Sequence, residues 1–142
     1  MLALLVALSP WLLYELGLSR FDAMPEKPGQ LATAEQQAQA WARARGTGMP
    51  KIEPMNPYSF VFNFVWRDPA SNTTPSESIA HLIATDYALQ QRPMMGNAHL
   101  ERVALAIWLT RHWTTEELMT AAAHPVVITF TSRKPRPVSA EP

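Results

Sequence analysis

The chain has 142 residues, a formal net charge of zero and no cysteine. This length suits one domain rather than two, and the neutral balance argues against a nucleic-acid-binding surface over the whole domain. Without cysteine the chain forms no disulfide and no zinc site built from thiolates. Thirteen prolines against five glycines indicate long extended connections rather than compact turns.

Residues 1–19 form an apolar run in which Glu15 is the first charged residue. The run is shorter than the roughly 20 residues that span a bilayer, and it lacks the basic start and the small-residue cleavage site of a signal peptide. A membrane anchor, a cleaved signal and a buried core helix all remain open, and Trp11 and Tyr14 suit either a membrane interface or a core. The side chains expected in the membrane are Leu2, Leu4, Leu5, Leu8, Trp11 and Leu12.

Residues 20–31 contain two prolines and a glycine and predict a linker. A helix is predicted over 32–45, where Thr33 and Gln36 match the capping-box pattern and Gly46 stands at the expected end. The proline-rich stretch that follows predicts no helix.

Residues 58–66 alternate aromatic and smaller side chains, and this period of two predicts a β-strand. The aromatic side chains either face the core or form a surface that meets lipid or a hydrophobic partner. A short β-like run follows at 126–131, and residues 132–142 predict a flexible, basic, proline-rich tail.

Three helices are predicted between these two β segments. Thr74, Pro75 and Glu77 mark the start of the first, which runs to about Gln91. The side chains expected on its apolar face are Ile79, Leu82, Ile83 and Tyr87.

The second of these helices is apolar almost all round, so it is expected at the centre of the fold. It ends at a sharp corner before Thr114, which matches a capping box with Glu117. Trp113 is expected to pack on Leu118 as a hydrophobic staple. The third helix is predicted over 115–123.

The sequence SESIAHLIATDYAL at 76–89 lies without a gap beside a motif close to GSTITQQLAKNLFL, and ALAIWLTRHWTTEELM at 104–119 follows the apolar helix, turn and S-K-x-E-I-L of the same family. On these residues the segment 76–119 resembles the peptidoglycan glycosyltransferases, the lysozyme-like transglycosylase domains that accompany penicillin-binding proteins. The resemblance implies a mainly α fold, a small and partial lysozyme-like helical domain with one or two short β strands and an N-terminal apolar helix.

The resemblance also implies which positions would bind. Ser78 replaces a threonine of the first motif, His81 stands at a binding glutamine, and Arg102 stands where the family carries a second glutamate. The catalytic glutamate that the family needs upstream has no counterpart here, so the resemblance implies a degenerate module with no assigned catalytic residue. Glu101 and Glu77 are the candidate acids if the chain is an enzyme.

Other chemistry is not indicated by the sequence. The four histidines form no ligand cluster with carboxylates, so no metal site is predicted. Glu77 and His81 are four residues apart on one helix, a spacing typical of a surface ion pair. No nucleotide or cofactor fingerprint occurs, and no cofactor is expected. Arg111 and His112 could meet phosphate or anionic lipid, but a solvated surface is the simpler interpretation.

The sequence therefore predicts one mostly helical domain over 32–131, attached by its N-terminal run to the bacterial inner membrane and lying in the periplasm. The expected function is non-catalytic binding of peptidoglycan glycan, of a lipid-linked precursor or of another envelope protein. One alternative is an active enzyme that transfers or cleaves peptidoglycan glycan through Glu101 or Glu77. Another is a membrane-anchored adaptor with no glycan role, in which residues 60–66 dock on a partner.

Overall fold

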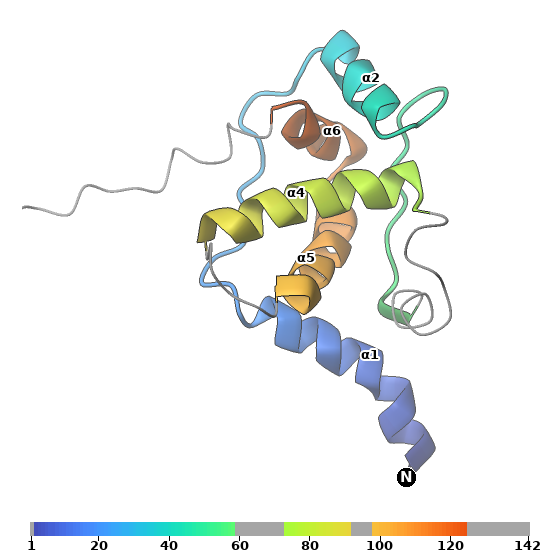
Figure 1. The fold of residues 1–142 in the computed structure, drawn as a ribbon, viewed down its shortest axis with the longest axis vertical. Coiled ribbons are helices and arrows are strands. Elements are labelled where there is room, and N and C mark those ends of the chain that lie inside the picture. Colours follow the sequence, from blue (N-terminus) through green and yellow to red (C-terminus); the bar gives the residue numbers. More distant parts are fainter. Residues whose placement is uncertain (1, 59–72, 92–97, 125–142) are drawn as a thin grey trace, which may run out of the picture.

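The computed structural model describes residues 2–58, 73–91 and 98–124, without the side chains of residues 2–7 and 98. Five helices lie within these ranges (Figure 1). They are α1 (Leu2–Leu18), α2 (Ala34–Arg43), α4 (Pro75–Gln91), α5 (Ala98–His112) and α6 (Thr115–Ala123). The mainly α fold expected from the sequence is confirmed, while its lysozyme-like identity stays a prediction.

The described ranges contain no β-strand. The strand predicted over 58–66 is wrong at its first residue, because Pro57 and Tyr58 are helical. The N–H of Tyr58 donates to Oδ1 of Asn56 at 3.0 Å, which is how a helix start is commonly capped. The rest of that segment and the β-like run predicted over 126–131 lie outside the described residues.

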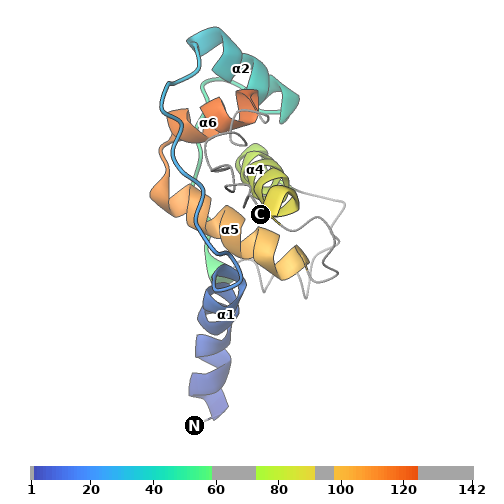
Figure 2. The same ribbon diagram turned by 90° about the vertical axis from the view of Figure 1, so that its left-hand side faces the viewer.

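α5 lies at the centre of the molecule, as its almost completely apolar surface predicts. α4 packs across it, α1 packs on its outer side, and α6 turns back from its end to contact both α4 and α2 (Figures 1 and 2). The largest fully buried side chains of these helices are Leu105, Ile107, Leu109, Leu118 and Met119. Most of this core therefore comes from α5 and α6.

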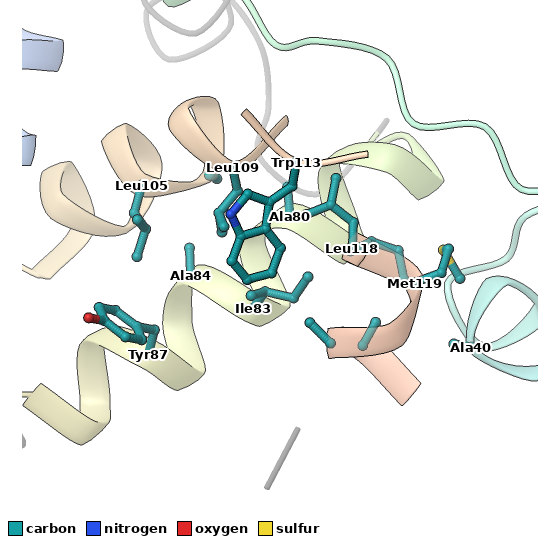
Figure 3. Packing of buried hydrophobic residues seen from close by; sticks show 14 of the residues in the cluster. Ala40, Ala80, Ile83, Ala84, Tyr87, Leu105, Leu109, Trp113, Leu118 and Met119 are labelled. Carbon is teal, nitrogen blue, oxygen red and sulfur yellow. The ribbon is translucent and has the colours of Figure 1, made fainter. Parts of the chain in front are cut away.

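The corner between α5 and α6 places Trp113 in the core (Figure 3). Trp113 and Leu118 belong to the same buried cluster, as expected for the staple. The indole N–H of Trp113 is buried without an acceptor among the described residues, so packing alone holds the ring. Trp113 and Leu118 therefore anchor the end of α5 and the start of α6 in the same hydrophobic core.

Three of the helices begin with a capping box, in which a threonine and the residue three positions later exchange hydrogen bonds. The pairs are Thr33 with Gln36, Thr74 with Glu77, and Thr114 with Glu117. A threonine cap typically stabilises a helix by about 1 kcal/mol. All three helix starts agree with the sequence prediction, because the signal lies within four consecutive residues.

The buried face of α4 differs from the predicted one. Ile79, Ile83 and Tyr87 are buried as expected, but Leu82 is 50 % exposed. The helix instead buries the small side chains Ala80, Ala84 and Ala88. Alanines at this spacing allow a neighbouring helix to approach closely, so α4 packs through backbone proximity as well as through large apolar groups.

Three threonines spaced five residues apart hold the extended connections against α5 and α6. The bonds run from Met55 N–H to Thr110 Oγ1 (3.0 Å), from Ile52 N–H to Thr115 Oγ1 (3.3 Å) and from Ala32 N–H to Thr120 Oγ1 (2.9 Å). An N–H in an extended segment without a strand partner needs such an acceptor when it is removed from water. The threonines therefore take the place of a β partner for these segments.

The end of α2 forms a Schellman motif one residue away from the predicted position. The N–H of Gly46 bonds to the carbonyl of Trp41 at 2.9 Å, and the N–H of Arg45 bonds to that of Ala42 at 2.9 Å. The left-handed residue is Arg45, with φ of 63°, and not Gly46. Gly46 is needed for space instead, because a Cβ there would collide with the Trp41 ring.

Candidate functional site

One side of α1 is buried against α5. Tyr14 is 7 % exposed and shares a small buried cluster with Val103, Ala104 and Ile107. Gly17 is also buried, and a Cβ added there would lie 2.5 Å from the Cβ of Ala104. The backbone of α1 therefore approaches α5 so closely that glycine is the residue that fits.

The other side of α1 carries leucines that the described residues do not cover. Leu8, Leu12 and Leu16 recur every four residues and are 45, 61 and 49 % exposed; we call them the outer leucine row. The N-terminal half of this helix extends beyond the other helices in both views (Figures 1 and 2). A single exposed leucine is ordinary, whereas aligned leucines on a projecting helix are typical of a binding surface.

Trp11 borders the outer leucine row and is held by α5. The guanidinium carbon of Arg111 lies 5.4 Å from the centroid of the Trp11 ring, a cation–π contact, and Arg111 also donates to the carbonyl of Met55 at 3.4 Å. The Trp11 and Tyr14 rings meet edge to face with centroids 5.8 Å apart. Burial raises the pKa of Tyr14, the charge of Glu15 raises it further, and that of Arg111 lowers it. Both charges therefore lie close to this aromatic pair.

Three of the side chains expected in the membrane, Leu8, Trp11 and Leu12, are thus exposed on α1. The three leucines expected nearer the N-terminus belong to the same helix, but their side chains lie outside the described part. Among the helices described, none combines the length and the apolarity that crossing a bilayer requires.

The predicted binding residue His81 lies on α4, within electrostatic range of Arg102 on α5. Burial is the largest cause that lowers the pKa of the half-buried His81. His99 and Arg102 lower this pKa further, while Glu77, one turn earlier on α4, raises it. Ser78 lies on the same half-exposed flank of α4 as His81. Ser78 and His81 therefore share one flank of α4, and the charge of Arg102 on α5 acts on His81.

The candidate catalytic glutamates have structural roles. Glu77 accepts a hydrogen bond from the N–H of Thr74 at 3.0 Å and completes the cap of α4. Glu101 is 7 % exposed and lies in the first turn of α5, where the helix dipole favours a negative charge. Neither glutamate lines the two hollows described below.

Glu117 caps α6 and also fixes the linker that follows α1. Its carboxylate accepts from the N–H of Thr114 at 2.8 Å and pairs with Nζ of Lys27 at 3.0 Å. Burial opposes ionisation, but the hydrogen bonds from Thr114 and Lys27 outweigh it and lower the pKa of Glu117. The Tyr87 hydroxyl holds the same linker by donating to the carbonyl of Ala23 at 2.9 Å. The direction in which α1 leaves the body is therefore set by α4 and α6.

A hollow of about 550 Å³ opens between α2 and the end of α6. Its polar lining residues are Gln36, Gln39, Arg43 and His124. Gln36 already serves the cap of α2, and Gln39 donates to Glu35 at 3.4 Å. A second hollow, between α1 and α5, measures about 10 Å³ and is no larger than a water molecule needs. Two of the four polar residues that line the larger hollow, Gln36 and Gln39, therefore already make hydrogen bonds within α2 and its cap.

Within the described residues no group of three or more His, Asp or Glu is arranged to hold a metal ion. Comparison of the chain with family models, with curated proteins and with solved structures finds no match. The resemblance of residues 76–119 to the peptidoglycan glycosyltransferases therefore stays a prediction. The exposed residues of α1 and their neighbour Arg111 are therefore identified from the structure alone.

Two residues of this surface were not among those expected in the membrane. Leu16 stands one turn beyond Leu12, so the four-residue spacing was the signal that could have included it. Arg111 was expected on a solvated surface, and its contact with Trp11 joins helices that are far apart in the sequence. No local pattern reveals a contact of that kind.

Proposed function

We propose that the chain is a non-catalytic module of the cell envelope, which α1 attaches to the membrane surface and whose helical body binds a peptidoglycan strand or its lipid-linked precursor. The attachment is supported above all by the outer leucine row on α1. The ligand class is supported by the resemblance of residues 76–119.

The exposed leucine surface is large enough to matter for binding. Complete burial of a leucine side chain contributes about 2 kcal/mol, and the three leucines of the row are each roughly half exposed. Burying Leu8 and Leu12, which precede the first charged residue of the helix, in lipid is therefore worth about 2 kcal/mol, which corresponds to roughly thirtyfold in affinity.

Vesicle binding tests the attachment. The variant in which Leu8 and Leu12 are both changed to Gln is expected to bind phosphatidylethanolamine–phosphatidylglycerol vesicles about thirtyfold more weakly than the unaltered chain in a sedimentation assay. The matched control changes Leu82 and Leu89, which are 50 and 52 % exposed on α4, to Gln, and its binding is expected to stay unchanged. Equal losses in both variants would refute a specific role for α1.

The absence of catalysis is supported by the positions of the glutamates. Glu77 and Glu117 are engaged in helix caps, and Glu117 is also paired with Lys27. Arg102 stands where the related enzymes carry a second acid, beside His81. If a glycan-transferring or glycan-cleaving activity is measured and Glu101→Gln abolishes it, the proposal of a non-catalytic module fails.

Ligand binding is tested with isolated peptidoglycan and with lipid-linked precursor in separate pull-downs. Changing both His81 and Arg102 to Ala is expected to weaken capture of the true ligand, whereas Arg45→Ala, at an exposed position just after α2, serves as the control. If neither ligand is captured and crosslinking in cells yields an envelope protein instead, the adaptor alternative replaces this part of the proposal.

A further inference from the structure

We infer that the membrane surface crosses α1 between Trp11 and Glu15, so that the preceding half of the helix enters the lipid end-first and Arg111 of α5 binds headgroup phosphate. The inference rests on the proposed membrane attachment. It adds the direction of α1, the depth of the body and a lipid-binding residue outside α1.

The distribution of charge along α1 sets the direction. No residue from 2 to 14 is charged, and Glu15 is the first acid and is exposed. Glu15 follows Leu8 by seven residues, which is two helical turns, so it projects from the same side as the outer leucine row. If α1 lay flat with this row in the acyl chains, the carboxylate of Glu15 would enter the hydrocarbon. Entering end-first leaves Glu15 in water.

Trp11 and Tyr14 set the depth. Indole and phenol rings concentrate at the level of lipid headgroups, where one edge is apolar and the other wet. The two rings contact each other, and Tyr14 is already buried against α5. Pro10 and Tyr14 are both buried, so the helix cannot sink past this level without losing its contact with the body. The aromatic pair therefore marks the level of the membrane surface.

Arg111 of α5 places a positive charge at the level of the Trp11 and Tyr14 rings. Its guanidinium lies over Trp11, and the side chain is exposed. One donor is used by the carbonyl of Met55, which leaves further N–H groups in the fork that arginine uses to bind phosphate. A guanidinium stacked on an interfacial tryptophan is suited to hold a phosphate of an anionic or zwitterionic lipid.

Depth measurements test the direction. The chain has no cysteine, so Leu8→Cys, Leu12→Cys and Leu16→Cys each provide one site for an environment-sensitive fluorophore, quenched by lipids with nitroxides at known depths. The label at position 8 is expected deepest and the label at 16 shallowest, with a difference of up to about 12 Å at 1.5 Å per residue. The label in Leu82→Cys on α4 should remain in water. Equal depths at the three positions mean a flat helix and overturn the inference.

A charge substitution tests the phosphate contact. Arg111→Gln is expected to lower affinity for vesicles containing phosphatidylglycerol about fivefold, and Arg111→Lys to recover part of it. The matched control is Arg43→Gln on α2, which is exposed and makes the same change in net charge. Equal losses in Arg43→Gln and Arg111→Gln, or no loss in Arg111→Gln, overturn the assignment of Arg111.

The outcomes separate this inference from the proposed function. If the unaltered chain binds no vesicle, both fail together. If it binds while the α1 labels stay unquenched, α1 is not the attachment and both fail again. If the labels are quenched at equal depths, α1 still attaches the chain and only the end-first geometry with its phosphate site is lost.

Discussion

Replacing Gly17 by Ala tests the close approach of α1 to α5. The added methyl group would lie 2.5 Å from the Cβ of Ala104 and 3.1 Å from the carbonyl oxygen of Leu100. Carbon atoms in contact prefer about 3.5 to 4.0 Å, so one of the helices must move by about 1 Å or more. The substitution therefore forces apart the surface that holds α1 on the body.

The expected loss follows from two opposing terms. Overpacking of a tight contact typically costs about 1 to 3 kcal/mol. Alanine in place of glycine inside a helix stabilises the helix by about 0.5 to 1 kcal/mol. The net expectation for Gly17→Ala is a loss of about 1 kcal/mol in the free energy that keeps α1 docked, and the two ranges limit this loss to at most about 2.5 kcal/mol.

Urea denaturation followed by circular dichroism measures the global free energy of unfolding, and amide hydrogen exchange measures the undocking of α1. Gly29→Ala is the matched control, since no atom lies within 4 Å of a Cβ at that position. In the double variant, Ala104→Gly should relieve the clash and recover about 1 kcal/mol relative to the sum of the single effects. If Gly17→Ala is as stable as the unaltered chain and α1 exchanges no faster, the close approach is refuted.

Three further substitutions probe the body. Arg45→Gly is expected to stabilise by about 0.5 to 1 kcal/mol, because φ of 63° is costly for a residue with a side chain, and Arg45→Ala should bring no such gain in a thermal melt. Thr110→Val is expected to cost about 1 to 2 kcal/mol and to speed hydrogen exchange at the N–H of Met55, which loses its acceptor; unchanged exchange would contradict this. His81 has a lowered pKa chiefly because of burial, so the folded state binds fewer protons than the unfolded one, and the stability that His81 contributes is complete above about pH 6.5 and is lost as the pH falls toward its native pKa. His81→Gln should flatten the stability curve between about pH 7 and pH 5 in urea titrations, and an unflattened curve would show that another group is responsible.

The helix starts could be predicted from the sequence because their cause is local. Thr33, Thr74 and Thr114 each lie three residues before the side chain that completes the cap, and no distant contact is needed. The central place of α5 could be predicted for a related reason, since a helix without a polar side has to be surrounded.

The packing of α4 and the end of α2 could not be predicted in the same way. Leu82 is more apolar than Ala84, yet α5 packs against the alanine side because a small residue permits a shorter distance between the helices. At the end of α2 the Trp41 ring occupies the space beside Gly46, so the left-handed conformation falls on Arg45. Both outcomes depend on tertiary neighbours that the local pattern does not contain.

The candidate site was likewise predictable from the sequence only in part. The apolar character of residues 1–19 was evident from the sequence, but its division into a face on α5 and the outer leucine row depends on Gly17 and Tyr14. The contact of Arg111 with Trp11 depends on how the linker directs α1 back to α5. The sequence therefore identified the segment, while the fold determined which of its side chains remain available.

The three threonine bonds to the connections make those segments sensitive to changes in length. Thr110, Thr115 and Thr120 bind backbone N–H groups, so any residue except proline can donate to them. The nearby prolines stand at positions 25, 28, 50, 54 and 57, all away from the three donors. One residue inserted between Ile52 and Pro54 would bring a proline opposite Thr110 and remove its donor. These three hydrogen bonds therefore constrain the length of the connections more than they constrain the identity of the three donor residues.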